Sequence, residues 1–138
     1  MRKFLLGLLT LGVFSLSLSA QRLCETHYYI VEPVKLMPVL LKHYKELGLS
    51  PEQRLKIKEE IRFLKEKILP LNRAIDKLSK KVREDMLHSD NRLLVEGELR
   101  ILANLKVEKS LYNYKCIRFL KETLTEEQFK KLLELAGY

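Results

Sequence analysis

The chain has 138 residues, of which 26 are Lys or Arg and 18 are Asp or Glu, so its formal net charge at pH 7 is +8. This length accommodates a single domain. The two cysteines are too few for a scaffold that several disulfide bonds hold together. A basic chain raises the question of a nucleic-acid partner, which the export signal at its start argues against.

Residues 1–20 have the features of a secretory signal peptide. Arg2 and Lys3 form a basic start, an uncharged apolar run begins at Phe4, and small residues end the segment at Ala20. We therefore expect cleavage near Ala20 and export to the periplasm. No stable membrane span is expected afterwards, because the apolar run is shorter than the roughly 20 residues that cross a bilayer. Without Arg2 and Lys3 the chain keeps 24 basic and 18 acidic residues, a net charge of +6.

The next segment, residues 21–35, has no clear apolar pattern and is predicted to be poorly ordered. From residue 36 to 138 the apolar residues recur at helical spacing, which predicts an all-helical domain. A first short helix is expected from about residue 36 to Leu47. Gly48 then closes it in the left-handed conformation that glycine adopts without strain.

The second helix is expected to begin at Pro51 and to reach about Leu87. Pro70 removes one backbone hydrogen bond, which should bend this helix without ending it. Its apolar residues alternate in steps of four and three, the period of a seam between helices packed side by side. The seam consists of Ile57, Ile61, Leu64, Ile68, Leu71, Ile75, Leu78 and Val82.

A polar turn leads to a third helix, expected from Asn91 to Glu122, and a last helix is expected from Glu126 to about Leu135. The fold class is therefore all-α, with four helices arranged as a long kinked antiparallel hairpin plus two short helices. The second helix would extend about 50 Å, which is longer than a compact domain of this size is wide. We expect a second copy to cover the remaining apolar surface in a homodimer.

Two copies of one pattern mark the starts of the second and last helices. In each copy a Ser or Thr can accept a hydrogen bond from the first helical turn, and a Gln three residues later can reach back to the cap's own N–H. Both are capping boxes, and both have Leu in front. The copies are Leu49-Ser50-Pro51-Glu52-Gln53 and Leu124-Thr125-Glu126-Glu127-Gln128.

This pair of motifs resembles the Leu-Thr-x-x-Gln signature of the Spy/CpxP family of periplasmic stress proteins, related to zinc-resistance-associated and heavy-metal sensor proteins. The first copy departs from the signature because Ser50 stands in place of Thr. The resemblance covers roughly residues 36–136. It implies an antiparallel, cradle-like homodimer and an ATP-independent chaperone that binds unfolded polypeptides during envelope stress.

The second helix also carries seven cations that follow its apolar seam by about one residue: Arg54, Lys58, Arg62, Lys65, Arg73, Lys77 and Lys80. This arrangement suits client capture, because apolar segments dock on an apolar strip and long-range attraction speeds encounter with acidic chains. Relatives in the family are expected to hold clients on such a basic, apolar-patched concavity. The alternative is a solvated face whose cations pair with Glu59, Glu60, Glu66 and Asp76, each pair contributing roughly 0 to 1 kcal/mol.

Metal binding is a second candidate, because some relatives of the family bind or sense transition metals. Cys24 and His27 have a spacing that could chelate, and Cys116 is a third potential ligand. These residues are too few for a dedicated site, so we predict no metal and no cofactor. His43 and His88 are expected at the surface, near helix ends.

In an oxidising compartment Cys24 and Cys116 are expected to be bonded, either within one chain or between two subunits. A redox function is not expected, because the chain has no Cys-x-x-Cys motif. It also has no Gly-rich phosphate loop, no Gly-x-Ser-x-Gly elbow and no His-Glu-x-x-His, so we do not expect an enzyme.

The expected function is that of a periplasmic chaperone or envelope-stress protein, a homodimer that binds unfolded proteins and no nucleic acid. The alternative is a regulator that binds an envelope two-component sensor kinase, or a periplasmic heavy-metal-binding or resistance protein.

Overall fold

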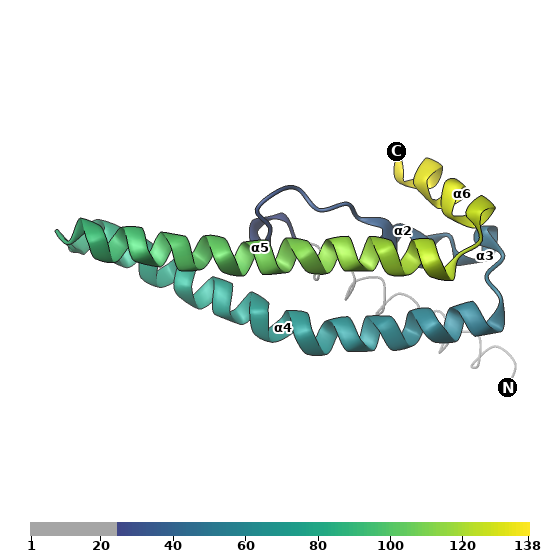
Figure 1. The fold of residues 1–138 in the computed structure, drawn as a ribbon, viewed down its shortest axis with the longest axis horizontal. Helices are drawn as coiled ribbons and strands as arrows, with labels where there is room; N and C mark the ends of the chain where they lie inside the picture. The colour runs from purple at the N-terminus through teal and green to yellow at the C-terminus, as the bar shows by residue number, and fades with distance from the viewer. Residues whose placement is uncertain (1–24) are drawn as a thin grey trace, which may run out of the picture.

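The structure is a computed structural model that describes residues 25–138 (Figure 1). The predicted signal peptide, its cleavage site and Cys24 lie outside the described residues. Within them the chain is all-helical and contains no strand. In chain order the elements are the 3-10 turn η1 (Thr26–Tyr28) and the α-helices α2 (Leu36–Lys42), α3 (Tyr44–Leu47), α4 (Pro51–His88), α5 (Arg92–Thr123) and α6 (Glu126–Ala136).

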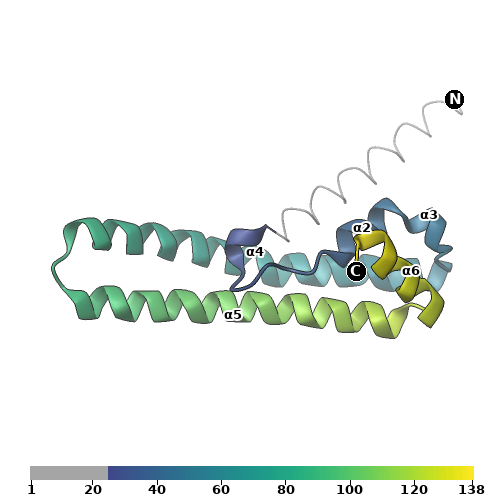
Figure 2. The same ribbon diagram turned by 90° about the horizontal axis from the view of Figure 1, so that it is seen from above.

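The two long helices α4 and α5 form the predicted antiparallel hairpin and run side by side along its length (Figure 2). The seam predicted on α4 is buried, apart from the half-buried Leu78. Pro70 lies inside α4 without ending it, and Figure 1 shows the helix changing direction along its middle part. The proline bends the helix because it removes one backbone hydrogen bond and crowds the preceding turn. The helix does not end there, because it continues on both sides of Pro70.

The main core lies at the open end of the hairpin, opposite the turn that joins α4 to α5. There α2, α3 and α6 cover the ends of the two long helices. Leu36 and Leu40 of α2, Leu120 of α5 and Leu132 of α6 are at most 1% exposed. Burial of a Leu side chain contributes about 1.5 to 3 kcal/mol, so this cluster holds the short helices on the hairpin.

The short helix predicted before Gly48 is divided in two. His43 has a non-helical backbone (φ −113°, ψ 21°), and α3 begins after it. The chain therefore has five α-helices in the described residues where the sequence pattern predicts four. Gly48 ends α3 with φ 63° and ψ 42°, which confirms the left-handed position predicted for it.

Residues 25–35 form a strap that lies along the hairpin between its middle and its open end (Figure 2). The Val34 N–H donates to Asn113 Oδ1 at 2.9 Å, and Asn113 Nδ2 donates back to the Val34 carbonyl at 2.9 Å. The Ile30 N–H donates to Ser110 Oγ at 3.2 Å. Residues 25–35 of the segment predicted to be poorly ordered therefore have partners on the hairpin, and residues 21–24 lie outside the described residues. These contacts come from side chains of α5, about 80 residues away, so a local pattern does not reveal them.

Candidate functional site

The seven predicted cations lie along one side of α4 and form the basic band. Six of them are exposed and Lys65 is half-buried. Leu55 and Leu69 lie two helical turns before and after Arg62, so all three residues share one side of the helix. Leu55 is 58% exposed and Leu69 is 44% exposed. The structure therefore places apolar side chains within the band as well as beside it.

Most of the basic band is not neutralised by neighbouring carboxylates. In residues 25–138 its only ion pair joins Arg62 to Glu66, with a long N–O distance of 3.9 Å between exposed side chains. Asp76 instead accepts a hydrogen bond from the Tyr28 hydroxyl at 2.7 Å and lies 3.5 Å from His27. A surface of unpaired cations keeps a positive potential that attracts acidic ligands.

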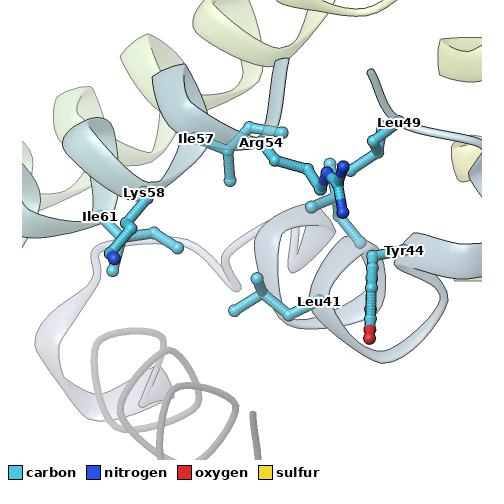
Figure 3. A pocket seen from close by; sticks show the side chains of 8 residues that line it. Leu41, Tyr44, Leu49, Arg54, Ile57, Lys58 and Ile61 are labelled. Carbon is cyan, nitrogen blue, oxygen red and sulfur yellow. The ribbon is translucent and has the colours of Figure 1, made fainter. Parts of the chain in front are cut away.

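A pocket of about 210 Å³ opens where the basic band meets the short helices. We call it the Tyr44 pocket. Figure 3 shows Ile57 and Ile61 of α4 facing Leu41 and Tyr44 across it, with Arg54 reaching from α4 towards Leu49. The full lining is Leu40, Leu41, Tyr44, Leu49, Arg54, Ile57, Lys58 and Ile61. A second hollow, of about 370 Å³, continues along the band over Leu55, Lys58, Glu59, Ile61, Arg62 and Lys65.

Both predicted capping boxes are present. Ser50 Oγ accepts from the Gln53 N–H at 3.1 Å, and Gln53 Oε1 accepts from the Ser50 N–H at 2.9 Å. Thr125 Oγ1 accepts from the Gln128 N–H at 3.2 Å, and Gln128 Oε1 accepts from the Thr125 N–H at 3.0 Å. Leu124, in front of the second box, is buried in the main core, where Phe129 also packs.

The two glutamine side chains also bind each other, which the sequence pattern does not show. Gln53 Nε2 donates to Gln128 Oε1 at 2.7 Å, and Gln128 Nε2 donates to Gln53 Oε1 at 3.2 Å. Gln53 Nε2 further donates to the Thr123 carbonyl at 3.1 Å, and Gln128 Nε2 to the Leu47 carbonyl at 3.1 Å. The two capping boxes therefore form one joint between the starts of α4 and α6.

A buried lysine anchors the strap to the hairpin. Lys109 of α5 is 0% exposed, and its Nζ lies 5.6 Å from the ring centre of Tyr28 and 5.1 Å from that of Tyr29. It also donates to Asn72 Oδ1 at 2.9 Å. The aromatic rings and the amide oxygen partly replace the water that the ammonium loses.

Burial is the main cause that raises the pKa of Tyr28 to about 12, and the hydrogen bond to Asp76 is the second.

The sequence contains a signal for the buried position of Lys109. Lys109 lies in the same row of α5 as Leu102, Leu105 and Tyr112, at steps of four and three.

A second polar cluster joins the two long helices nearer the turn of the hairpin. Lys81 of α4 donates to Asp85 at 2.5 Å and also to Glu98 of α5, whose side chain is 9% exposed. The hydrogen bonds that Lys81 donates to Asp85 and Glu98 raise the pKa of Lys81, and the bond that Asp85 accepts lowers the pKa of Asp85. Glu98 Oε2 is buried with no hydrogen-bond partner in the described part of the chain.

The histidines and the cysteine of the described residues lie in different elements of the fold. His43 Nδ1 lies 2.8 Å from Glu46 Oε1 at the break between α2 and α3, and this hydrogen bond lowers the pKa of Glu46. His88 is the last residue of α4 and is exposed, while Cys116 is half-buried beside the core. In residues 25–138 no group of three or more His, Cys, Asp or Glu side chains could hold a metal ion. Cys24, the expected partner of Cys116, is not among them.

Large apolar side chains are exposed in the half of the hairpin that carries the turn. They are Met86, Leu87, Leu93, Leu94, Leu99 and Ile101, between 42% and 79% exposed. Surface of this kind marks contact sites for other proteins when it is continuous. None of the helices in residues 25–138 has the length and the apolar composition that crossing a membrane requires.

Comparison of the chain with protein-family models, with curated proteins and with solved structures finds no match.

Proposed function

We propose that this protein is a periplasmic, ATP-independent chaperone that holds unfolded polypeptides on the basic band of α4. The observation that carries the proposal is the combination of exposed apolar side chains with cations of which only Arg62 has an ion pair in the described chain. The resemblance of its two capping motifs to the Spy/CpxP signature supports the same function. The signal-peptide pattern of residues 1–20 supports the location.

The chemistry of such binding is weak and reversible. Leu55 and Leu69 offer small separate apolar contacts, so a client gains only a few kilocalories per mole from each exposed segment that it buries. The unpaired cations speed the encounter with acidic clients and act over about 8 to 10 Å at physiological ionic strength. A client held this way can dissociate without ATP hydrolysis.

A homodimer is part of the proposal. The exposed apolar side chains near the turn of the hairpin, among them Leu87 and Leu93 at 78% and 79% exposure, would gain most from cover by a second copy. Two elongated hairpins can cover each other's apolar surface in one closed, two-fold arrangement. Analytical ultracentrifugation of the purified protein tests this part separately, because a monomer at all concentrations would contradict it.

The main experiment measures aggregation of a denatured acidic client by light scattering, with the purified protein at increasing ratios. We expect suppression near one dimer per client. The triple variant Arg62→Glu, Lys65→Glu and Lys77→Glu should lose most of it. The matched control is Lys115→Glu, Lys121→Glu and Lys130→Glu, which changes the net charge by the same amount at exposed positions of α5 and α6.

Equal loss in both triple variants would show that net charge, and not the basic band, controls capture. No suppression at any salt concentration would reject the chaperone function. Saturable binding of zinc, nickel or copper in a calorimetric titration, with a matching rise in Tm, would favour the metal-binding alternative.

A further inference from the structure

The walls of the Tyr44 pocket are almost entirely hydrocarbon. Five of its eight lining residues are aliphatic, namely Leu40, Leu41, Leu49, Ile57 and Ile61. The hydroxyl of Tyr44 is the only uncharged polar side-chain group in the lining. A peptide backbone bound there would lose hydrogen bonds to water without replacement, whereas a hydrocarbon chain has none to lose. The lining therefore favours an alkyl chain as the occupant.

The volume indicates how much of such a chain the pocket has room for. An enclosed apolar cavity of about 150 Å³ is known to hold benzene, which has six carbons. At the same density the Tyr44 pocket, of about 210 Å³ and open to solvent on one side, has room for an alkyl segment of about eight carbons.

The rim of the pocket favours an anionic head group. Arg54 and Lys58 are one helical turn apart on α4, both are exposed, and neither forms an ion pair within residues 25–138. A carboxylate at the mouth could therefore bind both cations without displacing a partner. Arg54 offers the paired N–H groups that match the two oxygens of a carboxylate.

From these observations we propose that the Tyr44 pocket binds a medium-chain alkyl carboxylate, with the chain between α4 and the short helices α2 and α3, and the carboxylate at Arg54 and Lys58. This site differs in ligand class from the client surface and does not depend on the proposed chaperone function. It makes use of the end of the basic band that lies nearest to the short helices.

The test is isothermal titration calorimetry of the purified protein with octanoate, kept below the concentration at which it forms micelles. We expect one saturable site with a Kd below about 1 mM, because the pocket is small and preformed. Acetate, which has the head without the chain, should not bind measurably. Octyltrimethylammonium, which has a similar chain and the opposite charge, should bind at least tenfold more weakly.

Two pairs of substitutions locate the site. Arg54→Gln with Lys58→Gln should weaken octanoate binding at least tenfold, and both positions are exposed, so folding should be retained. The matched control, Lys77→Gln with Lys80→Gln, removes the same charge from the other end of the basic band and should leave the Kd for octanoate unchanged. The control should still weaken client capture if the chaperone function is correct, so the two proposals can fail separately.

Three results would overturn the proposal. One is the absence of heat from octanoate together with no rise in Tm. Another is equal affinity for the cationic amphiphile, since the rim would then have no role. The last is binding to vesicles of an anionic phospholipid that is stronger than binding to free octanoate and that the Arg54 and Lys58 double variant loses. The occupant of the pocket would then be a lipid and not a free carboxylate.

Discussion

The joint between the two capping boxes leads to a specific energetic prediction. All four hydrogens on the two Nε2 atoms have acceptors, and each Oε1 accepts twice, once from a cap N–H and once from the other glutamine. The cap N–H groups are donors only, so they determine which end of each amide is the oxygen. The perturbation is a double-mutant cycle with Gln53→Ala and Gln128→Ala.

The expected loss in free energy of unfolding follows from counting the hydrogen bonds that each substitution removes. Gln53→Ala removes the bond from the Ser50 N–H, the bond to the Thr123 carbonyl and the pair with Gln128. At about 0.5 to 1.5 kcal/mol for each hydrogen bond, and with half of the joint exposed, each single variant should lose about 2 to 3 kcal/mol. The double variant should lose less than the sum by about 1 to 2 kcal/mol, because the mutual bonds are lost only once.

Urea unfolding, followed by circular dichroism at 222 nm, measures the cycle. The slope of the free energy of unfolding with urea should be the same for all four proteins, as it must be for the comparison to hold. Gln53→Glu is the matched control. Its carboxylate keeps the bond from the Ser50 N–H and can still accept from Gln128 Nε2, but it cannot donate to Thr123 or Gln128. It should therefore lose part of the coupling while the cap remains.

Additive effects, with a coupling free energy below about 0.3 kcal/mol, would refute this reasoning. The two motifs would then act as separate helix caps, and their contact would contribute nothing beyond the caps. A loss confined to the Gln53→Ala variant would likewise show that the joint is not reciprocal.

Three further predictions concern the strap and the glycines. Because the folded pKa of Tyr28 is about 12 against an ordinary value of 10.0, the neutral hydroxyl stabilises the fold fully below pH 10, and this stabilisation is lost as the pH rises to about 12. A spectrophotometric titration near 295 nm should show this late step, and Tyr28→Phe should abolish it. Asn113→Ala should cost about 2 kcal/mol and speed hydrogen exchange of the Val34 N–H, since the Val34 N–H loses its partner and the Val34 carbonyl keeps only the Leu36 N–H. Gly48→Ala should destabilise the protein by about 1 kcal/mol because φ is +63° there, whereas Gly97→Ala, in open space inside α5, should stabilise it by about 0.5 to 1 kcal/mol. Stabilisation by Gly48→Ala or destabilisation by Gly97→Ala in urea unfolding would contradict the backbone argument.

The periodic parts of the fold could be predicted, because they depend on local patterns. The seam from Ile57 to Val82 and the two capping boxes each require only a few neighbouring residues to be recognised, and α4 and α6 begin where the boxes indicate. Pro70 was expected to leave α4 unbroken and does so. The break at His43 could not be predicted, because the sequence from residue 36 to Leu47 contains no helix breaker after Pro38.

The contacts between distant segments were beyond a sequence pattern. Nothing local in Gln53 indicates that its Nε2 binds a glutamine 75 residues later. The same is true of the strap, where Tyr28 and Tyr29 are buried against α4 and α5 although the segment around them has no apolar period. The sequence places the cations of the basic band beside the seam of α4, but whether they have partners depends on side-chain geometry. The separation of Asp76 from the band is an example, since its carboxylate faces Tyr28.

The distribution of these contacts separates stability from binding in this molecule. The residues that hold the fold together, such as Leu40, Leu132, Gln53 and Gln128, are buried or fully bonded at the open end of the hairpin. Apart from the half-buried Lys65, the basic band is exposed, and it is nearly free of ion pairs in the described chain. Such exposed side chains contribute little to the free energy of unfolding. Charge substitutions in the band should therefore leave the Tm nearly unchanged. Any loss of client or octanoate binding in those variants can then be assigned to the surface itself and not to unfolding.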